Sequence, residues 1–94
     1  MQARDLAIEY YRRRFGTDVS KVFIHLVREV GEIALALERG NVDHAKIEIV
    51  ESIALLYHLA SIYGIGDIDD NMARIYSKKL ESITGNNVSI SNKQ

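Results

Sequence analysis

The chain contains no cysteine and no proline, and its formal net charge is only −1. Without cysteine it can form neither disulfides nor thiolate metal sites. A net charge near zero argues against a strongly basic nucleic-acid-binding protein. No apolar run reaches the about 18 residues that a membrane span requires, and residues 1–5 lack the core of a signal peptide. These absences predict a soluble, cytoplasmic protein that binds neither nucleic acid nor membranes.

The length and the hydrophobic content of the chain point to self-association. Ninety-four residues make one domain, and a chain this short buries only a modest fraction of its surface by itself. Nevertheless, 47% of the residues are hydrophobic. We therefore expect an oligomer that buries additional area between copies.

Four segments show the apolar period of an amphipathic helix, and none alternates convincingly with period two. Capping residues and glycines predict helices over about residues 3–15, from 17 or 18 to 40, from 41 or 43 to 64, and over 67–85. The last helix has an apolar stripe that we expect to face inward: Ile68, Met72, Ile75, Tyr76, Leu80 and Ile83. The pattern predicts an all-α, four-helix bundle-like domain over residues 1–85, followed by a polar tail, 86–94, that should be flexible.

Two pairs of glutamates carry the strongest functional signal. Glu29 and Glu32 form one pair, and Glu48 and Glu51 form the other. The i, i+3 spacing places both carboxylates of a pair on one face of a helix, close enough to share a cation. Like charges at this spacing repel unless something positive lies between them, and only Glu32 has a basic neighbour one turn away, Arg28. The pattern therefore predicts a divalent metal site.

The third predicted helix is apolar nearly all round over residues 53–63, so it should be buried on more than one side. Glu48 and Glu51 lie on this mostly buried helix, where carboxylates need hydrogen bonds, cations or metal. On the side of the helix away from the acids, three residues are candidates for an oligomer interface: Leu56, Leu59 and Tyr63.

Less specific interpretations stay open. Glu29 and Glu32 can belong to a solvated face, because basic residues lie on the same side of their helix. The histidines can support metal ligands, although an isolated histidine on a helix is more often a tolerated polar residue, which we favour for His25 and His44. If a metal binds, an all-carboxylate set favours Mg²⁺ or Mn²⁺.

The stretch 26–34, the pair Glu48 and Glu51, and the following residues 52–57 resemble the all-α, MazG-type nucleotide pyrophosphohydrolases. The signature of that family is ExxE, a spacer, and ExxD, and the resemblance spans roughly residues 25–80. It implies a four-helix fold that forms homodimers or homotetramers. It also implies hydrolysis of nucleoside triphosphates to monophosphate and pyrophosphate.

Carried over to this chain, the resemblance makes four residues both metal ligands and catalytic residues, with Mg²⁺ or Mn²⁺ as cofactor: Glu29, Glu32, Glu48 and Glu51. One of them would orient or deprotonate the attacking water. The chain departs from the family at Glu51, where the signature has Asp, and at Ile75, where the last helix usually carries Lys. Arg74 or Lys78 would then have to contact the phosphates. These departures leave a non-catalytic MazG-like oligomer as the alternative, and a plain helical interaction protein as a third possibility.

Overall fold

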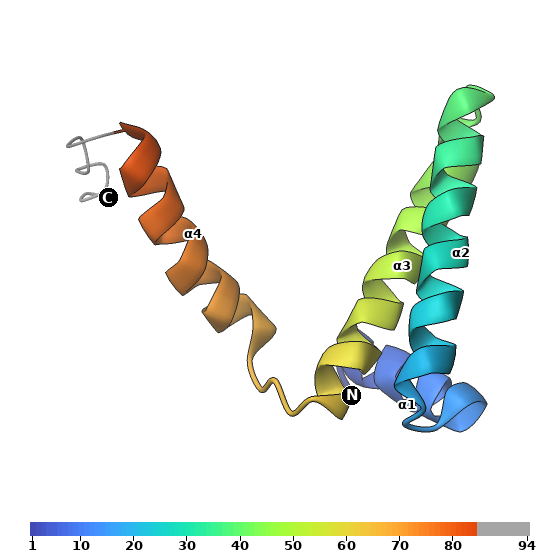
Figure 1. Ribbon diagram of the computed structural model, residues 1–94, viewed down its shortest axis with the longest axis horizontal. Helices are drawn as coiled ribbons and strands as arrows, with labels where there is room; N and C mark the ends of the chain where they lie inside the picture. The colour runs from blue at the N-terminus through green and yellow to red at the C-terminus, as the bar shows by residue number, and fades with distance from the viewer. Residues whose placement is uncertain (85–94) are drawn as a thin grey trace.

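The computed structural model describes residues 1–84, which form four α-helices and no strand. The helices are α1 (Ala3–Phe15), α2 (Val19–Glu38), α3 (Val42–Ile62) and α4 (Ile68–Thr84) (Figure 1). The all-α prediction is confirmed. The predicted tail, 86–94, lies outside the described residues. Within residues 1–84, no helix combines the length and the apolar composition that crossing a bilayer demands.

Short polar side chains begin three of the helices, as predicted. Asp18, Asn41 and Asp67 each accept a hydrogen bond from the backbone N–H three residues later, at 3.2, 3.1 and 2.9 Å. These bonds satisfy N–H groups that have no partner inside the helix. Between α2 and α3, Gly40 has a φ of 70°, the left-handed conformation that ends a helix and reverses the chain. The tight turn sets α2 and α3 side by side in opposite directions.

The core lies where α1 crosses the end of the α2–α3 hairpin (Figure 1). It consists of Tyr11 from α1, Val22 and Leu26 from α2, and Leu55 from α3. Leu59, which we expected at an oligomer interface, is partly buried and packs against this core within the chain. Helix α1 contacts α3 in the same chain.

A fully buried histidine joins α3 to the turn between α1 and α2. His58 is 1% exposed, and its Nε2 lies 2.9 Å from the carbonyl oxygen of Gly16. Because a carbonyl only accepts hydrogen bonds, Nε2 is the donor in this contact. Nδ1 is buried without a hydrogen-bond partner among the described residues. The contact holds the turn that sets α1 against the hairpin.

We expect His58→Ala to lower the free energy of unfolding by about 3 kcal/mol, because it removes a buried side chain and the donor to Gly16. Urea denaturation followed by circular dichroism measures this loss. Lys46→Ala, at an exposed position of the same helix, is the control and should change stability by less than about 0.5 kcal/mol. A loss below about 1 kcal/mol for His58→Ala would show that the contact does not brace the turn.

The fourth helix stands apart from the other three (Figure 1). Residues 63–67 lead α4 away from the end of α3, so its apolar stripe has no extensive packing against another described helix. Residues of this stripe are about half exposed or more: Met72, Ile75, Tyr76, Leu80 and Ile83. The expectation that they face inward is therefore wrong for the single chain. The described residues form a three-helix unit and a separate amphipathic helix.

Candidate metal centre

The α2–α3 hairpin brings the two glutamate pairs together. Because the helices run in opposite directions, Glu29 on α2 lies across from Glu48 and Glu51 on α3. One carboxylate oxygen from each of these three residues lies within 4.8 Å of the others. Glu32, almost one turn further along α2, forms a second such group with His44 and Glu48. The four predicted ligands thus fall into two groups that share Glu48.

Glu48 is the most enclosed of the four glutamates, with 9% of its surface exposed. Its Oε1 is buried and, as long as the neighbouring carboxylates are ionised, has no hydrogen-bond donor among the described residues. A buried carboxylate oxygen without a donor or a cation is costly. The side chain of Glu29 is only 16% exposed, so this residue does not lie on a solvent-exposed face of α2. The side chain of Glu32 is 53% exposed and does lie on such a face. Three carboxylates around a buried, unpartnered oxygen suit a hard divalent cation such as Mg²⁺.

Crowding of the carboxylates raises the pKa of Glu29 from 4.5 to about 7. The main cause is a hydrogen bond with the side chain of Glu48, which a neutral Glu29 can donate and two ionised carboxylates cannot make. Burial and the negative charges of Glu48, Glu51 and Glu32 raise the pKa further. Near neutral pH, a proton thus partly relieves the repulsion in the cluster. A divalent cation between the same oxygens would relieve it more completely.

The raised pKa of Glu29 predicts that the metal-free protein loses stability as the pH rises. Between the unfolded value of 4.5 and the folded value of about 7, the folded chain binds more protons than the unfolded chain. The contribution to stability is therefore complete below about pH 4.5 and lost as the pH passes about 7. We expect it to be of the order of 2 kcal/mol. Thermal or urea unfolding in a chelator across this pH range measures it.

Glu29→Gln is the comparison for this prediction, because glutamine does not titrate. The difference in stability between wild type and variant should decline from pH 4.5 to 7. The lowered pKa of His25 acts in the opposite direction, so His25 reduces the decline seen in the wild type alone. A difference that does not change with pH would contradict the shared proton.

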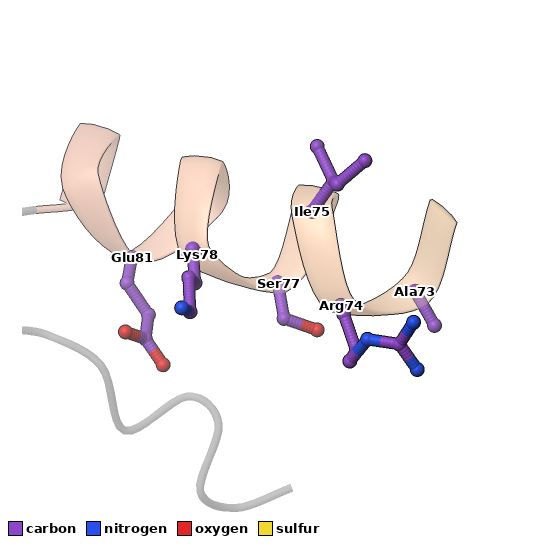
Figure 2. A pocket seen from close by; sticks show the side chains of 6 residues that line it. All are labelled: Ala73, Arg74, Ile75, Ser77, Lys78 and Glu81. Carbon is purple, nitrogen blue, oxygen red and sulfur yellow. The ribbon is translucent and has the colours of Figure 1, made fainter. Parts of the chain in front are cut away.

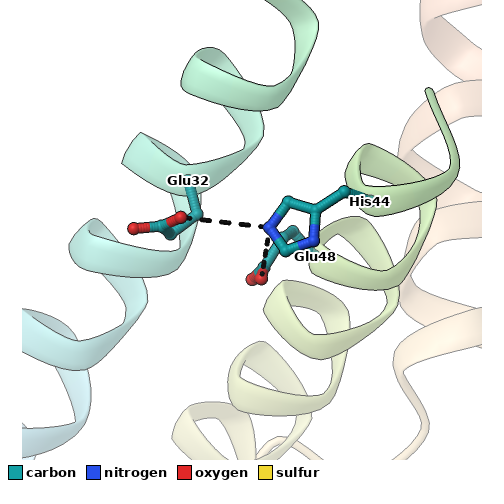
Figure 3. Close-up of side chains that lie close together, drawn as sticks. All are labelled: Glu32, His44 and Glu48. Carbon is teal, nitrogen blue, oxygen red and sulfur yellow. Dashed lines mark ion pairs between the residues drawn. The ribbon is translucent and has the colours of Figure 1, made fainter. Parts of the chain in front are cut away.

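The second group places an imidazole between carboxylates from two helices (Figure 3). His44 Nε2 is 3.3 Å from Glu48 Oε2 and 4.0 Å from Glu32 Oε1. The side chains of His44 and Glu32 are 45% and 53% exposed, so this group opens to solvent. This group offers a metal ion three ligand atoms, one nitrogen and two oxygens, on the solvent-accessible side of the buried Glu48.

A histidine precedes each glutamate pair at the same spacing, a repeat that the sequence prediction missed. The pattern His-x-x-x-Glu-x-x-Glu occupies residues 25–32 on α2 and again residues 44–51 on α3. His25 Nε2 lies 3.1 Å from Glu29 Oε2, which matches the contact between His44 and Glu48. Both histidines therefore contact the acids, and neither is merely a tolerated polar residue. The i, i+4 spacing was the available signal, since it places two side chains on adjacent turns.

The two histidines have different surroundings. The ring of His25 packs against Phe15 with centroids 5.1 Å apart, and burial, with smaller contributions from two arginines, lowers its pKa. Tyr11 of α1 lies nearby, and burial raises the pKa of its hydroxyl, as do the charges of two of the glutamates. Aromatic side chains of α1 thus close the cluster at His25, whereas the end at His44 stays open.

The predicted phosphate contacts lie apart from both groups. Arg74 and Lys78 belong to α4, which stands away from the hairpin (Figure 1). Arg74 forms an ion pair with Asp70 and donates a hydrogen bond to Asn71 Oδ1 at 3.0 Å. A surface depression of about 640 Å³ follows α4 and is lined by Ala73, Arg74, Ile75, Ser77, Lys78 and Glu81 (Figure 2). Within the described part of one chain, neither basic residue lies beside the glutamates.

Comparisons of the chain with protein-family models, with curated proteins and with solved structures find no match. The resemblance to MazG-type hydrolases therefore rests on the glutamate pairs and their helical setting. Any function has to be argued from the geometry of the two groups.

Proposed function

We propose that this protein is a Mg²⁺-dependent nucleoside triphosphate pyrophosphohydrolase. The observation that carries the proposal is the buried carboxylate of Glu48, whose Oε1 is unpartnered among the described residues and which groups with Glu29 and Glu51. Mg²⁺ held by a few carboxylates keeps open positions and commonly binds substrate phosphates as well. The resemblance of the two glutamate pairs to the MazG-type signature supplies the reaction.

In this proposal, Glu29, Glu48 and Glu51 hold the cation and Glu32 lies at the edge of the site. When bound, Mg²⁺ neutralises part of the negative charge on the triphosphate. Water attacks phosphorus of the α–β anhydride, the bond to the leaving phosphate oxygen breaks, and the water proton passes to a carboxylate. Glu51 is the proposed acceptor, because it is exposed to solvent while Glu29 and Glu48 are enclosed.

The proposal includes a homo-oligomer, formed through an exposed apolar face of the hairpin. On α2 the residues of this face recur at alternating steps of four and three: Phe23, Val27, Val30, Ala34 and Leu37. On α3 and at its C-cap the same steps recur: Ile49, Ile53, Leu56, Ala60 and Tyr63. Apart from the two alanines, these side chains are 42–67% exposed. We call these two rows the hairpin face.

The spacing of the hairpin face suggests a second copy as its partner. Alternating steps of four and three are those with which helices pack in coiled coils and four-helix bundles. On each helix, the row lies about 100° around the axis from the residues that face the other helix. Because the two helices are antiparallel, this rotation places both rows on the same side of the hairpin. The helices are of nearly equal length, 20 and 21 residues, so two hairpins can cover each other fully. In such an oligomer, α4 of another copy could bring Arg74 and Lys78 to the substrate phosphates.

Two alternatives to a working hydrolase differ in what they bind. A non-catalytic MazG-like oligomer would keep the Mg²⁺ site and lose turnover, through Glu51 in place of Asp or Ile75 in place of Lys. A helical interaction protein would need neither Mg²⁺ nor nucleotide. Both alternatives keep the hairpin face, so the state of oligomerisation does not separate them.

Pyrophosphate release from the common ribo- and deoxyribonucleoside triphosphates, with Mg²⁺ and with Mn²⁺, tests the proposed activity. We expect turnover of at least one nucleotide that stops when a chelator removes the cation. No turnover, with Mg²⁺ still raising the melting temperature, would favour the non-catalytic oligomer. Neither turnover nor a response to Mg²⁺ or Mn²⁺ would favour the interaction protein.

A further inference from the structure

The second group in the hairpin has the spacing of a metal site. His44 Nε2 and Glu48 Oε2 are 3.3 Å apart. Two ligands on tetrahedral Zn²⁺ with bonds of about 2.0–2.1 Å lie at about this distance. Glu32 Oε1 is 4.0 Å from the same nitrogen, and its half-exposed side chain can close the gap by a change of rotamer. Figure 3 shows the three side chains meeting in the space between α2 and α3.

The chemistry of this group differs from that of the three carboxylates beside it. Imidazole suits Zn²⁺ and other transition metals, whereas carboxylate oxygens alone suit Mg²⁺, Ca²⁺ or Mn²⁺. His44 is the only nitrogen donor among the members of the two groups. Three protein ligands on a tetrahedral ion also leave one position for water or substrate, as in catalytic zinc sites.

Glu48 connects the two groups. Its Oε2 lies beside His44, whereas its Oε1 is buried without a hydrogen-bond partner among the described residues. The side chain is 11% exposed, and its carboxylate belongs to both sets of ligand atoms. With its two oxygens, the Glu48 carboxylate could contribute to both groups, and pairs of cations about 3.5–4 Å apart occur in phosphoryl-transfer sites.

We propose that Glu32, His44 and Glu48 form a second cation site that binds Zn²⁺, with Glu48 bridging to the Mg²⁺ site of the proposed function. The zinc site shares Glu48 with the Mg²⁺ site, and only this bridging role rests on the proposed function. Binding of Zn²⁺ by the three side chains needs no hydrolase activity. The two cation sites thus differ in their preferred metal because one of them contains an imidazole.

The repeated pattern on α2 provides an internal comparison, a corresponding set of residues that should not bind Zn²⁺. By the pseudo-symmetry of the hairpin, His25, Glu29 and Glu51 correspond to the members of the proposed zinc site. Among the described residues, these three do not form a group with ligand atoms within 4.8 Å of one another. The ring of His25 instead packs against Phe15. Zinc binding should therefore involve His44 and not His25.

Zinc titration of the full chain in saturating Mg²⁺ tests the proposal by calorimetry and by ¹⁵N nuclear magnetic resonance of the imidazole rings. Zn²⁺ is diamagnetic, so the ring signals remain visible. We expect one tight Zn²⁺ per chain and a large shift of the His44 ring nitrogens, with His25 nearly unchanged. His44→Gln should raise the Kd for Zn²⁺ by more than about tenfold, since even residues that only support a ligand cost about 10–100-fold.

Glu51→Gln is the matched control, because Glu51 belongs to the carboxylate group and not to the proposed zinc site. It should keep tight Zn²⁺ binding, whereas His44→Gln should lose it. Both positions are exposed, and circular dichroism checks that both variants fold. Unchanged Zn²⁺ affinity in His44→Gln, a shift at His25 in place of His44, or no Zn²⁺ binding by wild type would overturn the proposal.

The outcome for the zinc site is separable from the outcome for hydrolysis. Zn²⁺ bound through His44 without any pyrophosphate release would reject the proposed activity and keep the second site. Mg²⁺-dependent release with no zinc binding would reject the second site and keep the activity.

Discussion

Replacing Glu48 by glutamine is expected to lower pyrophosphate release by at least about 100-fold, because a site that stabilises phosphoryl charge depends strongly on each placed group. Glu48 belongs to both groups of ligands and is more than nine-tenths buried. Glutamine keeps the volume of the side chain but removes the charge that holds a cation. The same variant should lose the increase in melting temperature that Mg²⁺ gives the wild type. Initial rates and thermal unfolding with and without Mg²⁺ measure both effects.

Glu38→Gln provides the control for this change. Glu38 is exposed at the end of α2 and is not a member of either group, so the same loss of charge should leave the rate and the Mg²⁺ effect nearly unchanged. Without metal at neutral pH, Glu48→Gln should unfold at a higher temperature than wild type, because it relieves repulsion among buried carboxylates. A full Mg²⁺ effect in Glu48→Gln would place the cation somewhere other than the hairpin.

Local features of the fold could be predicted from the sequence because their causes are local. A side chain such as Asp18 or Asn41 caps a helix through its own neighbours, and Gly40 turns the chain through its own backbone. The same holds for the glutamate pairs, since i, i+3 spacing fixes which face of a helix each carboxylate occupies. The short turn between α2 and α3 then brings the two pairs together.

Other features depend on contacts that spacing alone does not determine. The stripe on α4 indicates a face to be covered, but not which surface covers it, and residues 63–67 direct that helix away from its own chain. The division of the glutamates into two groups depends on how α2 and α3 are offset along the hairpin, which places Glu32 beside His44. The contacts of the histidines follow the same rule as the glutamate pairs and could have been predicted from the i, i+4 spacing.

The largest effect on assembly is expected for Leu56→Glu. Light scattering of the wild type at micromolar concentration should give a dimer or a larger species, and the variant should approach the 10.6 kDa of one chain. Leu56 is 48% exposed in the chain and lies within the α3 row of the hairpin face. Burying a carboxylate against an apolar surface without a partner costs several kcal/mol, and a two-fold interface would contain the change twice.

Ile47→Glu is the control for this prediction, because Ile47 is 56% exposed and lies outside the rows of the hairpin face. It adds the same charge to α3 and should leave the mass of the oligomer unchanged. A wild-type monomer would contradict the proposed oligomer. If Leu56→Glu stays assembled while Met72→Glu dissociates, the stripe of α4 is the contact and the hairpin face is not. A monomeric Leu56→Glu that still binds Mg²⁺ but has lost hydrolysis would show that the cation site is complete in one chain while the phosphate contacts come from another.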